Sequence, residues 1–308
     1  MNNSARFLLN FRCGYQLVFA LAFLLGLVAC KPSIKQRTGD VVATEEIKMN
    51  EEIIINLGEK GTDFSKRHRA LVRVVHQPAG VDFYELNWPV APRGKVKFDV
   101  GRSSFGISNV LSVSTSQDLG PLKDEGFNEI DINAGITAPE LISHDEARLK
   151  FYEVLKALKA KGWTQRYYHD DPRISGRFRL DHILGVSDSI GLDCDYVPSI
   201  QEWMRIPSRT ACMLYAAGVF LDVSFTREPS LIDPTKPGAY LLTYNLKTDT
   251  EYFRGFAGPD DRLRWKEVLK PELAKAAASR AEKEAALRAK GVPIDESYQD
   301  PPLPAGLR

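Results

Sequence analysis

Residues 144–161 constrain the fold more than any other segment, because their apolar side chains recur with the period of an α-helix. Ser143 and Glu146 stand three positions apart in the pattern of a capping box, and Gly162 follows where a left-handed residue ends a helix. A helix with one apolar stripe has to bury that stripe against another element. The stripe of this helix consists of Ala147, Phe151, Val154, Leu155 and Leu158.

Most other apolar segments alternate with period two, which is typical of half-buried β-strands. The alternation in residues 219–225 and 240–246, with a Pro-containing segment between them, predicts antiparallel neighbours joined by a long loop. These segments predict an α+β fold class, in which antiparallel sheets carry one well-capped amphipathic helix and a C-terminal helical extension follows. Further strands are expected at residues 53–55, 70–75, 95–100, 107–114 and 164–168.

Changes in composition divide the folded part of the chain into three segments. Residues 51–170 are predicted to form an α+β domain, and residues 171–258 a second β-rich region, either as a separate domain or as part of the first. Residues 259–308 are rich in Ala, Glu, Lys and Arg, which predicts a helical extension that is interrupted or restarted at Pro271. After Gly291 the Pro-rich tail is expected to be disordered.

The N-terminal segment has the organisation of an export signal. Arg6 and Arg12 precede an unbroken apolar run, residues 17–28, that is too short to span a bilayer. The run ends in Leu27-Val28-Ala29-Cys30, which resembles the lipobox of bacterial lipoproteins. An uncleaved anchor helix, or a signal cut by the ordinary peptidase, are the alternatives.

The lipobox resemblance implies that residues 1–29 are removed and that Cys30 carries the lipid. The polar residues 30–50 then form a flexible, lipidated tether, and the lipid bilayer becomes a partner of the protein through Cys30. The protein is expected to face the periplasm of a bacterial envelope. Lys31 rather than Asp after the cysteine slightly favours the outer membrane.

Cys194 and Cys212 are the two cysteines that remain in an exported protein, and we expect them to form a disulfide. Two separately buried thiols are the alternative. Loss of residues 1–29 removes two of the 41 basic residues and none of the 40 acidic ones, so the mature chain is close to neutral. This balance predicts no nucleic-acid partner.

The sequence contains none of the compact motifs of nucleophilic, metal or phosphate sites, and we expect no catalytic or metal-binding residues and no cofactor. One polar cluster supports an alternative, a metal-dependent envelope enzyme, if folding brings its members together. The cluster consists of His169, Asp170, Asp171, Asp181, His182, Asp188, Asp193 and Asp195.

Residues 143–151, continuing to Leu158 and Gly162-Trp163, are similar to a helix of immunity lipoproteins that block type VI secretion phospholipase effectors in the periplasm. The resemblance implies a protein that binds a toxic lipase or phospholipase and covers the mouth of its active site. A structural or assembly lipoprotein of the envelope is the alternative. Aromatic and Arg side chains are the expected anchors of such an interface. The candidates are Trp88, Tyr167, Tyr168, Arg173, Arg177, Phe178, Tyr252, Phe253 and Arg254.

Overall fold

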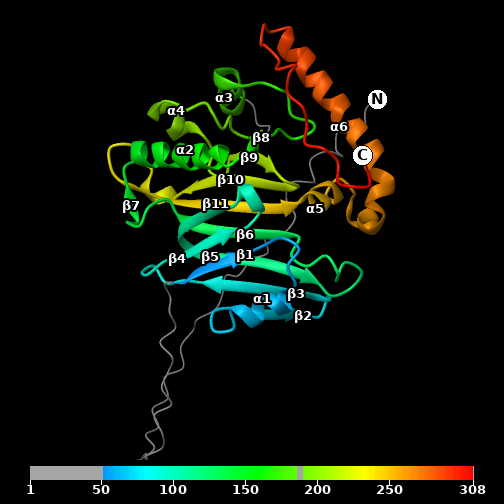
Figure 1. Ribbon diagram of the computed structural model, residues 1–308. Helices are drawn as coiled ribbons and strands as arrows, with labels where there is room; N and C mark the ends of the chain where they lie inside the picture. The colour runs from blue at the N-terminus through cyan, green and yellow to red at the C-terminus, as the bar shows by residue number, and fades with distance from the viewer. Residues whose placement is uncertain (1–50, 186–189, 308) are drawn as a thin grey trace, which may run out of the picture. The chain divides into compact units, whose positions relative to one another are not determined.

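The computed structural model describes residues 51–185 and 190–307, in which eleven strands join into one sheet (Figure 1). The predicted signal peptide, the lipidation site Cys30 and the tether therefore lie outside the described residues. The strands are β1 (Glu52–Ile55), β2 (Arg73–Gln77), β3 (Val81–Asn87), β4 (Gly94–Phe98), β5 (Phe105–Asp118), β6 (Glu129–Gly135), β7 (Leu141–Ile142), β8 (Thr164–Gln165), β9 (Ala211–Ala216), β10 (Val219–Arg227) and β11 (Gly238–Thr248).

The helices are short except for two. None of those in the described residues is long and apolar enough to cross a membrane. The α-helices are α1 (Gly61–Arg67), α2 (His144–Ala160), α3 (Gly176–Gly185), α4 (Ile200–Arg205), α5 (Asp249–Arg254) and α6 (Trp265–Arg288), and the 3₁₀ turns are η1 (Gly101–Ser103), η2 (Pro229–Leu231) and η3 (Pro259–Arg264).

The sheet runs in the order β1-β4-β5-β6-β11-β10-β9-β8, and all of these pairs are antiparallel except β1 with β4. The long strand β5 pairs with β4 over its first half and with β3 over its second half, and β2 pairs with β3. Short β7 joins the beginning of β11. The predicted α+β class is confirmed.

One face of the sheet is covered by α2, whose apolar stripe is buried as predicted except for Val154, which is partly buried (Figure 1). The Phe151 ring lies 5.4 Å from Phe225 of β10 and 5.7 Å from Trp203 of α4. Because side chains alternate along a strand, Phe220 of β10 points to the opposite face. There it forms a second apolar cluster, whose other buried members are Phe253, Ala257, Trp265 and Leu269 of α5, α6 and the segment between them.

The predicted ends of α2 are confirmed. The Ser143 hydroxyl accepts a hydrogen bond from the Glu146 amide at 3.2 Å, and Gly162 adopts a φ of +88°. The two predicted antiparallel strands are β10 and β11. Strand 164–168 is shorter than predicted and ends at Gln165, because the next residues turn toward the C-terminal segment. The short helices α1, α3 and α5 are not predicted, since fewer than three turns give little periodicity.

The two predicted regions 51–170 and 171–258 share one sheet, because β6 of the first pairs with β11 of the second along seven residue pairs. Residues 171–258 are therefore not a separate domain. Pro271 lies inside α6, which continues past it. The tail that was expected to be disordered follows α6 as an irregular segment with defined contacts, because its carboxylates and Tyr298 find partners on the rest of the chain.

The predicted disulfide between Cys194 and Cys212 is present, with Cα atoms 5.4 Å apart. It fastens the irregular segment around Cys194 to the buried strand β9. The Leu192 amide donates to the Ala211 carbonyl at 2.7 Å, so a backbone hydrogen bond supports the same attachment.

Substitution of either cysteine should destabilise the protein to the same extent, because each loses the same closed loop of 18 residues. We expect Cys194→Ser and Cys212→Ser each to lower the free energy of unfolding by about 3 kcal/mol, measured by urea denaturation. The wild-type protein under reducing conditions is the control and should match both variants. Unequal losses would show that the two thiols act separately.

Candidate functional site

A cleft of about 530 Å³ opens beside edge strand β8. Four segments distant in the sequence contribute to it: β8 with the residues that follow it, the start of α3, the loop on either side of Cys194, and the C-terminal segment. Its lining is dominated by carboxylates and tyrosines. The lining residues are Gln165, Tyr167, Ser175, Gly176, Asp193, Asp195, Tyr196, Asp295 and Tyr298.

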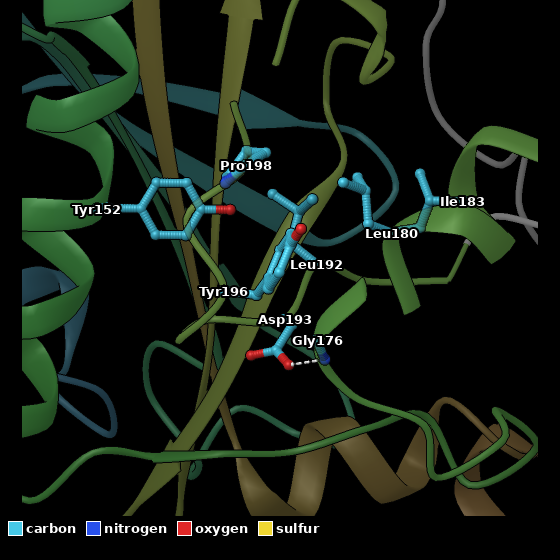
Figure 2. Close-up of a pocket in the computed structure, with 8 residues that line it drawn as sticks. All are labelled: Tyr152, Gly176, Leu180, Ile183, Leu192, Asp193, Tyr196 and Pro198. Carbon is cyan, nitrogen blue, oxygen red and sulfur yellow. Dashed lines mark hydrogen bonds between the residues drawn. The ribbon is translucent and has the colours of Figure 1, made fainter. Parts of the chain in front are cut away.

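A smaller cavity of about 10 Å³ shares Gly176, Asp193 and Tyr196 with the cleft. Figure 2 shows these residues with Tyr152 of α2 and the apolar side chains that line the same cavity. A volume of this size holds at most about one water molecule. The protein is therefore closely packed around this small cavity, and the cleft is the part of the site that can admit a ligand.

Asp193 fixes the geometry of the cleft. Its side chain is buried and accepts hydrogen bonds from the Gly176 amide at 2.6 Å, drawn in Figure 2, and from the Asp195 amide at 2.8 Å. Asp195 forms an ion pair with Lys159 at the end of α2. Asp295 accepts bonds from the amide and hydroxyl of Ser297, and these bonds lower the pKa of the Asp295 carboxyl.

The tyrosines give the cleft its apolar surface. The rings of Tyr167 and Tyr298 lie 4.6 Å apart, and the Tyr298 hydroxyl accepts a hydrogen bond from the Tyr167 amide at 2.9 Å. Tyr167 is buried, and burial raises the pKa of its hydroxyl to about 12. The guanidinium of Arg179 lies 4.2 Å from the centre of the Tyr167 ring. Tyr167 is thus held between a buried cation and the ring of Tyr298.

Arg179 is the internal support of this region, because it is fully buried and binds segments on two sides of the cleft. Its Nε donates to the Gly191 carbonyl at 2.5 Å, and its Nη2 lies 3.5 Å from the Asp171 carboxylate. Burial lowers the pKa of the Arg179 guanidinium, and Asp171 opposes that shift. A buried cation facing a buried carboxylate holds both chain segments in place.

Carboxylates next to aromatic ring faces are suited to a cationic group such as a guanidinium or an ammonium. Phe178 and Val197, which follow lining residues in the sequence, have 44% and 46% of their surfaces exposed. Aromatic side chains are enriched at protein-binding surfaces, so the tyrosines are the lining residues most suited to contact a partner protein.

Among the predicted interface residues, four are buried, and the prediction of exposed anchors is wrong for them. Trp88 packs over Gly94, where a side chain would collide with the indole, and Phe253 belongs to the second apolar cluster. Arg254 is buried because Glu125 and Glu251 pair with it. Tyr167 is buried but lines the cleft with its accessible edge. At the three aromatic positions, burial of a large apolar area outweighs exposure.

The other predicted anchors do not form one surface. Arg173 is paired with Glu284, Arg177 with Asp181 and Glu202, and Tyr252 stacks on Phe220 at 3.7 Å. Tyr168 lies near the buried Arg166, and Phe178 is exposed. The acidic residues, Tyr196 and Tyr298 of the cleft were not predicted as interface residues, because segments about 130 residues apart carry no joint spacing signal.

The predicted His and Asp cluster is dispersed. His169 packs against Phe253, Phe256 and Tyr252, while Asp181 and Asp195 pair with basic residues. In residues 51–185 and 190–307, no three His, Cys, Asp or Glu side chains form a group that could hold a metal ion. Asp188 lies outside the described residues.

Removal of the buried cation should destabilise the whole cleft. We expect Arg179→Met to lower the free energy of unfolding by about 3–5 kcal/mol, because it leaves the Asp171 carboxylate buried without its countercharge. The matched control is Arg177→Met two residues away, whose exposed ion pairs contribute little to stability because water and salt screen them. Chemical denaturation measures both, and equal losses would contradict the assigned support role.

Stability should fall on mild acidification, because burial lowers the pKa of His169. The unfolded chain then binds the His169 proton at a higher pH than the folded protein does, so the contribution is complete above the ordinary histidine pKa of about 6.5 and decreases below it. We expect the unfolding free energy to decline between pH 7 and pH 5, and less steeply in His169→Gln. Burial also lowers the pKa of His68, so His68 still contributes part of the pH dependence of stability in the His169→Gln variant. Identical slopes would contradict the prediction.

Comparison of the chain with protein-family models, with curated proteins and with solved structures finds no match.

Proposed function

We propose that the protein is a lipid-anchored protein of the bacterial envelope that acts by binding another protein through the cleft. The partner proposed is an exported lipase or phospholipase effector, which binding holds inactive. The lipobox-like sequence at Cys30 supports the anchor, and the similarity of residues 143–163 to immunity lipoproteins supports the choice of partner.

One observation carries the binding proposal: the disulfide directly adjoins residues that line the cleft. Cys194 lies between the lining residues Asp193 and Asp195, and the Cys194 amide donates to the Gln165 side chain at 2.9 Å. Oxidation thus fixes the position of two of the three carboxylates. Disulfides persist in exported proteins and are rare in the reducing cytosol. A binding site whose geometry is held by a disulfide is suited to function in the periplasm.

The charge of the cleft indicates the chemistry of the partner surface. Asp193, Asp195 and Asp295 face the cleft, and Lys159 offsets part of their charge. A loop of the partner that carries Arg or Lys would place its cation against these carboxylates and its stem against the tyrosines. Tyrosine side chains lose little conformational entropy on binding, which favours affinity.

The test is capture of the partner with the acylated, tagged protein from its native host, followed by a protection assay. We expect a lipase-type protein to co-purify and its periplasmic toxicity to be suppressed by the wild-type chain. Tyr196→Ala should weaken the isolated complex by about tenfold to a hundredfold, which corresponds to about 1.4–2.7 kcal/mol for an interface anchor.

The control variant is Leu263→Ala, an exposed apolar residue of η3 outside the cleft, which should bind like the wild type. Recovery of no lipase-type protein, together with no protection, would contradict the proposed partner. A complex that is weakened equally by both variants, or by neither, would contradict the cleft as its site.

A further inference from the structure

We infer that residues 292–307, here called the C-terminal strap, form a detachable wall that closes one side of the cleft and is held there mainly by charged contacts. The inference rests on the proposed use of the cleft for binding, because it states how access to that site is regulated. Two strap residues, Asp295 and Tyr298, line the cleft.

The path of the strap starts with a reversal of the chain after α6. Gly291 has a φ of +77°, and the Val292 amide donates back to the Leu287 carbonyl at 3.1 Å. The Asp295 amide of the strap then donates to the Arg173 carbonyl at 2.7 Å. The next attachment is the Tyr298 hydroxyl, which accepts from the Tyr167 amide. The strap therefore lies along the segment that follows β8.

Arg280 of α6 is the central holding contact. Its guanidinium pairs with Asp300 of the strap at 2.7 and 3.0 Å. The same group donates to the carbonyls of Asp171 and Tyr168, at 2.9 and 2.7 Å. One side chain thus joins helix, strap and the 168–171 segment, and its loss would release all three connections at once.

Further ion pairs join the strap to α6 toward the end of that helix. Glu296 of the strap pairs with Arg288 and with Arg173, and Arg173 pairs in turn with the buried Glu284 of α6. The side chains of Arg288 and Glu296 are about half and two-thirds exposed. Exposed pairs of this kind are weak individually and are screened by salt.

Apolar burial in this attachment is mostly partial. Beyond Leu269, the residue of α6 that is buried is Glu284. In the strap Pro304 is buried, and the larger apolar side chains, Val292, Ile294, Leu303 and Leu307, are partly covered. The hydrophobic effect scales with the area removed from water, so partial burial of scattered side chains contributes little. The sheet, in contrast, contains continuous rows of buried apolar side chains, as along β10 and β11.

Release of the strap would change the cleft in two ways. The ring face of Tyr167 would lose its contact with Tyr298, and the Tyr167 amide beside the edge of the sheet would lose its acceptor. A larger cleft bordered by a free edge is able to admit a wider partner segment. The Tyr167 amide therefore reports directly whether the strap is in place.

The experiment is amide hydrogen exchange on the full acylated protein in detergent, at low and at high NaCl concentration. The readout is the exchange rate of the Tyr167 amide relative to that of the Arg166 amide, which donates to the Met213 carbonyl in the sheet. We expect high salt, Arg280→Gln and Tyr298→Ala each to accelerate exchange at Tyr167 by about tenfold or more and to leave Arg166 unchanged, as local opening requires.

The matched control is Arg264→Gln on η3, which removes an exposed ion pair with Asp261 that involves no strap residue and should alter neither amide. Equal exchange at Tyr167 in all variants and salt conditions would overturn the inference. Parallel acceleration at Tyr167 and Arg166 would also overturn it, since it would show global rather than local opening. The measurement needs no partner, so its failure is distinguishable from failure of the proposed binding function.

Discussion

The pairing of β6 with β11 is the contact on which the rest of the fold depends, because it joins the first and second halves of the chain into one sheet. Both faces of the pair are occupied by matched side chains. On the buried face Ile132 stands opposite Tyr244 in register. On the other face Asn245 donates to Glu129 at 2.6 Å and to Asp131 at 2.8 Å. A shift of the strand pairing by one residue would move every side chain of the strand to the opposite face of the sheet. The register is therefore fixed by burial and by hydrogen bonding together.

This register places the edge of the sheet on which the cleft is built. Strands β10, β9 and β8 follow β11 in order, so β8 is the last strand and its outer side is open to irregular segments. The disulfide to β9 and the buried Arg179 attach those segments to the sheet. The cleft therefore combines a rigid floor with one wall, the C-terminal strap, which ion pairs attach to α6. Such a combination can keep a site preorganised while leaving its width adjustable.

The alternation of side chains along β10 explains why the C-terminal helix attaches where it does. Val223 and Phe225 belong to the core beneath α2. Phe220 points to the other face and packs in one apolar cluster with Phe253 and Trp265. Only the first part of α6 takes part in this second cluster. The remainder of the helix extends beyond it and depends on arginine and glutamate contacts, since its surface consists largely of alanine and charged residues.

The sequence by itself determined the elements whose information is local. The α2 stripe, its Ser143 cap, the alternation in β10 and β11, and the pairing of the only two cysteines outside the N-terminal segment each follow from residue types a few positions apart or from simple counting. Only the tertiary structure decided which side chains are accessible. Arg254 and Trp88 are buried by partners and contacts distant in the sequence, and the cleft gathers residues from Gln165 to Tyr298. Periodicity records which face of one element is apolar, but the identity of the element that covers that face is set by packing across the whole chain.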